Sequence, residues 1–314
     1  VLLIARDDDK PVLSLHYTLF DDDSDTVLAT AASSLFIWNH NDSVVVCDID
    51  GTITKSNARG ALATMVLEQY CDYAHDGVCS FFQELLQQQD NLRILYLTSR
   101  PLQYAQMTRR FLNILVQDGT DNARLPRGPL FLHSGNLATV LFSELITKDM
   151  HLYKSDTLFR QVVLPFVAAA GTGSGSSSNS VLCGGFGNSL TDVVAYEMVG
   201  IPRDCIYMID KKSRITCLDK RDEALVKTVQ HDLHEVKIQQ ALQDEVNDAN
   251  GHDSNKTMRN SAAQQRLRRS SIKKMIGSTY SGYHDPALLK SLVSKLEMKA
   301  TRPAPLPRSN TCIF

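Results

Sequence analysis

Residues 43–60 read SVVVCDIDGTITKSNARG, a short apolar run that stops at two aspartates one residue apart. An unbroken apolar run of this kind is typical of a parallel strand buried on both faces. Asp48 and Asp50 therefore come at the carboxyl end of a predicted strand. Ligands of open parallel sheets bind beyond this end of the strands, so the stretch predicts a functional site there.

The chain after this stretch alternates between strand-like and helix-like segments. Four further apolar runs read LRILYLT, GPLFLH, NSVLCGG and CIYMID, and the helical stretches between and around the strands are 58–74, 78–88, 101–117 and 189–199. Such alternation predicts an α/β fold, a Rossmann-like parallel sheet covered on both faces, over residues 43–219. The Gly/Ser-rich segment 168–180 is predicted to be a flexible insertion in it.

The two ends of the chain differ from this middle part. Residues 11–38 hold two strand-like runs around the acidic turn DDDSD, so residues 1–42 are predicted to be a β-strand segment. Residues 220–314 show no strand pattern and carry 16 Lys and Arg against 10 Asp and Glu, a local net charge of +6. They are predicted to form a basic tail, helical or disordered.

Composition narrows the class of protein. Of the 314 residues 43% are hydrophobic and 22% charged, which is ordinary for a globular protein, and the formal net charge of −2 argues against general nucleic-acid binding. We expect no nucleic-acid contact. The seven cysteines form no CxxC pair, so reduced thiols are expected. No apolar run approaches the ~20 residues that span a bilayer, and no signal peptide is visible.

Asp48 and Asp50 suit phosphate transfer. Asp48 can attack phosphorus to give an aspartyl-phosphate, and Asp50 can protonate the leaving oxygen and then activate water. Carboxylates beside a phosphate dianion need a cation, and Mg²⁺, which prefers oxygen ligands, is the expected cofactor. The alternative is a turn in which the two aspartates only cap a helix.

The next strand ends in Thr98, Ser99 and Arg100, followed by Pro101, which favours the start of a helix. Hydroxyls and free backbone N–H groups at such a point can hold a phosphate, so the three residues are candidates for substrate binding. The simpler interpretation of Thr98 is a helix cap.

Two later segments complete the candidate site. Lys154, between the third strand and a helix, can supply a cation to the nucleophile and the phosphate, although a lone lysine is usually a solvated surface residue. Asn188 and Asp192 follow the glycines of GGFGNSLTD and are four residues apart, so both can face the site from one helical turn. They are candidate metal ligands with Asp48 and Asp50, or helix caps.

The four pieces in this order resemble the haloacid dehalogenase-like phosphatases. VVVCDIDGTITKSNARG, LYLTSRP, LPRGPLFL and GFGNSLTDVVAYEMVGIP are similar to the catalytic C-terminal region of lipin phosphatidate phosphatases, over residues 35–218. The resemblance implies Mg²⁺-dependent conversion of phosphatidate to diacylglycerol at a membrane surface. It also implies that residues 11–38 belong to an immunoglobulin-like β-domain whose other strands precede this chain.

The resemblance assigns roles to the candidate residues. Asp48 is the nucleophile and a metal ligand, Asp50 the acid/base, Thr98 the phosphate-binding hydroxyl and Lys154 the motif lysine, while Asn188 and Asp192 form the metal side. Asn57 stands where the lipin-like loop usually has aspartate, and Thr98 where serine is more frequent. Both departures are conservative enough to leave catalysis intact.

Two other functions remain open from the sequence. One is a phosphatase of the same superfamily that acts on a protein or a small metabolite, and the other is a catalytically silent lipid-sensing domain. The two aspartates with Lys154 and Asp192 favour catalysis, and the resemblance favours a cytoplasmic protein held peripherally on the endoplasmic reticulum or nuclear membrane.

The basic tail predicts a second contact with that membrane. Residues 256–274 contain seven Lys and Arg and no acid, which favours binding to an anionic surface. Ser270 and Ser271 directly follow arginines, so a protein kinase acting there would add negative charge and weaken the contact. A solvated, disordered stretch is the alternative.

Overall fold

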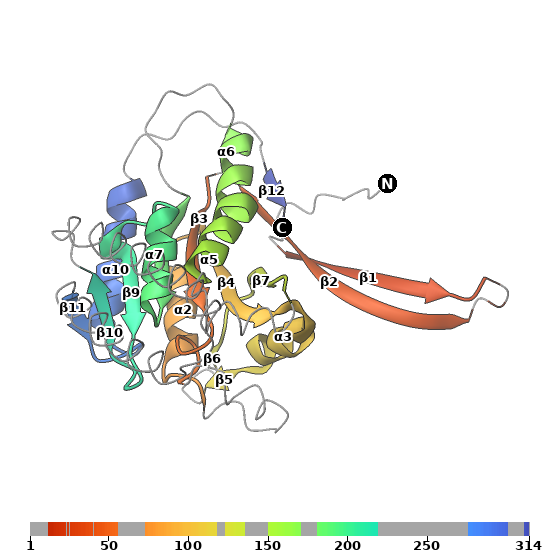
Figure 1. Cartoon of the computed structure of the whole chain (residues 1–314), viewed down its shortest axis with the longest axis horizontal. Helices are drawn as coiled ribbons and strands as arrows, with labels where there is room; N and C mark the ends of the chain where they lie inside the picture. Colours follow the sequence, from red (N-terminus) through yellow and green to blue (C-terminus); the bar gives the residue numbers. More distant parts are fainter. Residues whose placement is uncertain are drawn as a thin grey trace, which may run out of the picture.

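The computed structural model describes residues 12–22, 24, 26–39, 41–55, 73–117, 123–135, 150–170, 181–218, 276–300 and 311–313. These residues build an α/β body and a β-hairpin that extends away from it (Figure 1). The predicted helix 58–74 lies almost wholly outside the described residues, as do Asn57, the segment 171–180 and the tail residues 256–274 with Ser270 and Ser271.

The body is organised around a seven-stranded sheet in the order β11-β10-β9-β8-β3-β4-β7. The five strands from β9 to β7 run parallel, whereas β10 and β11 are antiparallel additions at one edge. The predicted α/β sheet is thus present, mixed but mostly parallel. In chain order its strands are β3 (Ser43–Asp48), β4 (Leu92–Pro101), β7 (Leu130–His133), β8 (Leu182–Gly187), β9 (Ile206–Ile209), β10 (Ile215–Leu218) and β11 (Ile276–Tyr280).

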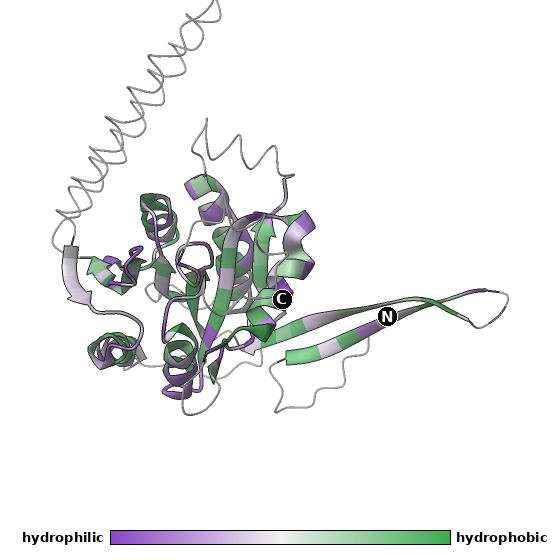
Figure 2. Ribbon diagram, turned by 90° about the horizontal axis from the view of Figure 1, so that it is seen from below, coloured by the Kyte–Doolittle hydropathy of each residue, from purple (hydrophilic) through white to green (hydrophobic). Residues whose placement is uncertain are grey.

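Helices cover both faces of this sheet, as the apolar strands require. The first hydrophobic cluster joins one face to α2 (Val78–Gln87), α3 (Ala105–Ile114) and α10 (Pro286–Ala300). The second joins the other face to α5 (Met150–Leu158), which continues through the π-helical turn Phe159–Val163 into α6 (Leu164–Ala170), and to α7 (Leu190–Met198). In Figure 2 the hydrophobic colouring concentrates on the strands between these layers.

The hairpin consists of β1 (Val12–Phe20) and β2 (Val27–Asn39), paired antiparallel. The short strand β12 (Thr311–Ile313) pairs with the end of β2 next to the body and completes a three-stranded sheet. Two short strands, β5 (Val116–Gln117) and β6 (Ala123–Arg124), form a separate ribbon beyond α3. The strand-like runs expected in residues 11–38 are therefore strands, and the acidic segment of the sequence lies between them.

The expected end of the folded body at residue 219 does not coincide with the end of the sheet. β11 pairs with β10, and Leu288, Leu292 and Leu296 of α10 are at most 3% exposed in the first hydrophobic cluster. Residues 276–300 of the predicted tail thus belong to the body, whereas 311–313 pair with the hairpin. The pattern was missed because β11 reads IGSTY, a short edge strand with one strong apolar residue. The predicted insertion also begins later than expected, since residues 168–170 are the last turn of α6.

Within the described part of the chain, no helix combines the length and the apolar character needed to cross a membrane.

Candidate active site

The candidate residues gather at one edge of the sheet because their strands are parallel. β3 lies between β4 and β8 and runs parallel to both. Asp48 ends β3, Thr98 and Arg100 lie near the end of β4, and Asn188 follows β8 directly. Ser99, half-buried between Thr98 and Arg100, reaches the same edge. The sheet thus brings together three segments that are far apart in the sequence.

Lys154 joins two carboxylates at this edge. Its Nζ donates to Asp48 Oδ1 at 2.6 Å and to Asp192 Oδ1 at 2.5 Å. The side chains of all three residues are 5% exposed or less. The lysine comes from α5 and Asp192 from the first turn of α7, two helices packed on the same face of the sheet. Lys154 is therefore a buried member of the site and not a solvated surface lysine.

Burial and the close charges shift the pKa values of these three groups in different directions. Burial raises the pKa of Asp48 from 3.8 to about 7, against the attraction of Lys154, and the neighbouring Asp192 and Asp50 raise it further. Burial also opposes ionisation of Asp192, but Lys154 and the hydrogen bonds from Ser189 and Asn188 hold its pKa below the usual value. For Lys154 the two carboxylates outweigh burial and raise the pKa. The ammonium is thus shared between an ionised Asp192 and an Asp48 that gains a proton readily.

Asp50 is bound by the residues of β4. Arg100 contacts both of its oxygens, with Nη2 2.7 Å from Oδ1 and Nε 2.9 Å from Oδ2, and Thr98 Oγ1 donates to Oδ2 at 3.0 Å. The Arg100 guanidinium also donates to Thr108 Oγ1 of α3. The sequence suggested that Thr98 and Arg100 hold the substrate phosphate. In the structure Thr98 and Arg100 contact Asp50, and phosphate binding by Thr98, Ser99 and Arg100 stays a prediction.

The turn after β8 forms the last side of the site. The backbone N–H groups of Asn188 and Ser189 donate to Asp192 Oδ2, and the Ser189 side chain accepts from the Asp192 N–H, which is a capping box at the start of α7. Asp192 is therefore both a helix cap, the simpler of its two interpretations, and a partner of Lys154. Its position is fixed by the helix end.

The oxygen donors at this edge suit a hard cation such as Mg²⁺. Asp48, Asp50 and Asp192 carry three carboxylates against the two positive charges of Lys154 and Arg100, and the raised pKa of Asp48 reflects burial of that negative charge. A divalent cation would favour the ionised form of Asp48. Although no three acidic, histidine or cysteine side chains of the described residues converge into a ready metal cage, the chemistry of the donors fits Mg²⁺.

Sequence reasoning missed four contributors to this site. Thr52 Oγ1 donates to Asp48 Oδ2 at 3.1 Å, and Thr108 supports Arg100. Ser189 caps α7, and its signal was available, because Ser189 and Asp192 have the spacing of a capping box. From beyond residue 219, Tyr283 donates to the backbone oxygen of Thr52 at 3.1 Å, a contact for which the sequence held no local signal.

The chain is similar to a known family and to several curated proteins. The family model described as LNS2 (Lipin/Ned1/Smp2) matches residues 15–236. Phosphatidic acid phosphohydrolase 1 of Saccharomyces cerevisiae is 33% identical over 187 residues, which are 60% of this chain and 21% of that protein. Phosphatidate phosphatase LPIN2 of Homo sapiens is 31% identical over 190 residues, 59% of this chain and 18% of that protein. The chain thus spans about a fifth of the length of the curated relatives it matches.

Proposed function

The chain belongs to the LNS2 (Lipin/Ned1/Smp2) family, and from this premise we propose that it is a Mg²⁺-dependent phosphatidate phosphatase that releases diacylglycerol and phosphate. The observation that carries the proposal is the pair of contacts made by Lys154 of α5, which binds Asp48 at the end of β3 and Asp192 of α7. A silent domain has no need to bury an ammonium between two carboxylates, since an apolar cluster of the same volume is at least as stable.

The reaction proceeds in two steps. In the first, a carboxylate oxygen of Asp48 attacks phosphorus, the bond from phosphorus to the ester oxygen breaks, and Asp50 gives a proton to the departing alkoxide of diacylglycerol. In the second, Asp50 takes a proton from water as the water oxygen attacks phosphorus, and the bond from phosphorus to Asp48 breaks. Phosphate leaves and Asp48 is regenerated.

The surrounding residues prepare these two carboxylates. Lys154 and Thr52 each donate to one oxygen of Asp48 and so set its orientation. Arg100 and Thr98 donate to the two oxygens of Asp50 and so set its orientation for both proton transfers. Mg²⁺, held by Asp48 and Asp50 with Asn188 and Asp192, would supply the positive charge that lets a carboxylate approach a phosphate dianion.

We also propose the finer architecture that the resemblance implies. The α/β body is a haloacid dehalogenase-type domain, and the sheet β1-β2-β12 is part of an incomplete immunoglobulin-like domain. One face of the hairpin supports the second assignment, because it presents Leu13, Leu15, Tyr17 and Leu19, of which Tyr17 is 53% and Leu19 60% exposed. Further strands packed on this face would bury it.

The test of activity is phosphate release from phosphatidate in mixed micelles, with Mg²⁺ and with EDTA, beside a soluble aryl phosphate and a phosphopeptide. We expect release from phosphatidate that stops in EDTA and returns with Mg²⁺, whereas Ca²⁺ substitutes poorly because its geometry is looser. Faster phosphate release from the phosphopeptide or the aryl phosphate would show that phosphatidate is not the preferred substrate. Binding of phosphatidate without release would identify a lipid-sensing domain.

We further propose that residues 256–274 hold the protein peripherally on the cytoplasmic side of the endoplasmic reticulum or nuclear membrane, and that a protein kinase acting at Ser270 or Ser271 weakens the contact. Since β11 and α10 belong to the body, the test removes only residues 256–274 and compares co-sedimentation with anionic vesicles at low and high salt. Loss of binding on deletion, and at high salt, is expected. Equal binding of the vesicles by the full chain and by the chain without residues 256–274 would exclude this segment as the membrane contact.

A further inference from the structure

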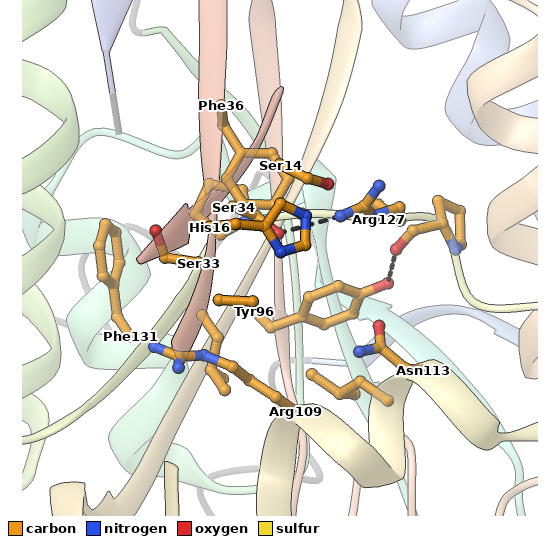
Figure 3. A pocket seen from close by; sticks show the side chains of 16 residues that line it. Ser14, His16, Ser33, Ser34, Phe36, Tyr96, Arg109, Asn113, Arg127 and Phe131 are labelled. Carbon is orange, nitrogen blue, oxygen red and sulfur yellow. Dashed lines mark hydrogen bonds between the residues drawn. The ribbon is translucent and has the colours of Figure 1, made fainter. Parts of the chain in front are cut away.

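A cavity of about 440 Å³ lies between the β1–β2 hairpin and the α/β body (Figure 3). One wall is the hairpin face that carries Ser14 and His16, paired in register with Ser34 and Ala32. The opposite wall comes from α3 and from the segment between β6 and β7. We call this cavity the hairpin groove. None of the residues assigned to the reaction above lines it, so it is a separate site.

The groove carries positive charge. Arg109 of α3, Arg127 and His16 of β1 line it, and Figure 3 shows Arg127 beside His16 and Ser34, with Arg109 directed toward Phe131. Among the described lining residues there is no carboxylate. Arg127 Nη2 donates to Ser34 Oγ at 2.9 Å, which leaves the rest of its guanidinium available to a ligand. The Arg127 guanidinium beside the Ser34 hydroxyl suits a phosphate group, which a planar guanidinium binds through paired hydrogen bonds, and Arg109 adds positive charge to the groove.

The part of the groove that presents Arg127 is held firmly against the sheet. The buried Tyr96 donates from its hydroxyl to the backbone oxygen of Pro126 at 2.7 Å. At Gly128 an added Cβ would lie 2.3 Å from the backbone oxygen of Ile94, so only glycine permits this close approach of the chain to β4. Arg127 lies between these two fixed points.

Much of the remaining lining is apolar. Phe36, Leu112, Leu130 and Phe131 contribute to the walls, and the volume lies within the range of small-molecule sites. A bare phosphate ion would leave most of this volume to water. The lining therefore suits a phosphate ester with an organic part about the size of glycerol.

We propose that the hairpin groove binds the phosphate group of a phosphate ester at a site distinct from the catalytic carboxylates. Two sources share this chemistry: a soluble ester such as glycerol phosphate, and the headgroup of an anionic lipid. The helix α3 contacts both sites, because Thr108 and Phe111 contact Arg100 while Arg109 and Leu112 line the groove.

The test measures binding to the full chain in EDTA, by calorimetry with glycerol phosphate and by co-sedimentation with phosphatidylglycerol vesicles against phosphatidylcholine vesicles. The variant is Arg109→Gln with Arg127→Gln. The control is Arg124→Gln, which removes one positive charge, against two in the double variant, from an exposed arginine outside the lining whose guanidinium donates to the Asn113 backbone oxygen. Because all three arginines are exposed, circular dichroism and the urea midpoint should stay unchanged.

We expect the double variant to weaken binding about tenfold or more, and Arg124→Gln to bind as the wild type does. If the double variant loses binding of glycerol phosphate, the ligand is a soluble ester. If it loses only the binding to phosphatidylglycerol vesicles, the ligand is a lipid headgroup. Binding that is equal in the double variant and in Arg124→Gln, or absent from the wild type in both assays, would overturn the proposal. Phosphatidate turnover, assayed separately, reports on the catalytic site, so the two proposals fail independently.

Discussion

At the scale of single residues, Asp48 and Lys154 determine what the site can do. A buried carboxylate with one ammonium partner is a poor nucleophile when it holds a proton and a good one when it does not. The single positive charge of Lys154 interacts with Asp192 as well as with Asp48, so it does not fully compensate the negative charge of Asp48. This shared lysine explains why burial raises the pKa of Asp48 even though an ammonium lies 2.6 Å away.

Replacing Asp48 by asparagine tests its role as nucleophile. An amide cannot attack phosphorus, so we expect a loss of turnover greater than the ~10²- to 10⁴-fold that removal of a general acid or base produces. The control is Asp156→Asn, an exposed carboxylate of the same helix as Lys154, paired only with Arg160 in the described chain. If purified Asp48→Asn keeps more than a few per cent of the wild-type phosphate release, Asp48 is not the nucleophile.

The raised pKa of Asp48 predicts how stability depends on pH in EDTA. Between pH 3.8 and about 7 the folded chain keeps a proton on Asp48 that the unfolded chain has released. Rising pH therefore favours unfolding over this window. We expect the free energy of unfolding of the wild type, relative to Asp48→Asn, to fall from about pH 4 to about pH 7 and then to level off. Urea titrations of both proteins over that range measure it. If the free energy of unfolding of the wild type, relative to Asp48→Asn, rises with pH, the pKa of Asp48 is not raised in the folded chain.

At the scale of elements, the junction of β8 and α7 places Asp192. The strand ends in glycines, and an added Cβ on Gly187 would lie 2.5 Å from Cβ of Asp192. The helix start can approach the strand only because Gly187 has no side chain. The capping box and the contact with Lys154 both depend on this approach.

We expect Gly187→Ala to displace Asp192, to lower the free energy of unfolding by about 1–3 kcal/mol and to reduce turnover strongly. Gly184→Ala in the same strand is the matched control, because its Cβ would meet no atom closer than 3.5 Å. Urea unfolding and phosphate release, measured on both variants, compare the two positions. Equal behaviour of the two alanine variants would show that the close approach at Gly187 does not matter.

At the scale of the whole molecule, the hydrophobic core of the α/β body is complete only with residues after position 275. Leu288, Leu292 and Leu296 of α10 pack with Phe82 of α2 and with β9 and β10 in one cluster, and Tyr283 reaches the loop of the candidate site. These contacts join the end of the body to its beginning.

A chain that ends at residue 218 should therefore lose cooperative unfolding and expose apolar surface. The reason is that the sheet face covered by α10 becomes exposed and β10 loses its edge partner. Near-ultraviolet circular dichroism and dye binding measure the change. Deletion of residues 171–178, a Gly/Ser-rich stretch, is the comparison, and it should matter little because a change of a few residues in the length of a connection changes closure entropy only modestly. Native-like unfolding of the shortened chain would contradict the role of α10.

The sequence by itself determined the parallel sheet, the edge at which the site lies and the identity of its carboxylates. These features are local, because a buried strand shows as an apolar run and the polar residues that follow it must lie at its carboxyl end. The tertiary structure alone decided that Lys154 bridges Asp48 and Asp192, that Arg100 binds Asp50, and that α10 completes the core. Each of these contacts joins residues far apart in the chain, and no local pattern encodes which of many possible partners packing selects.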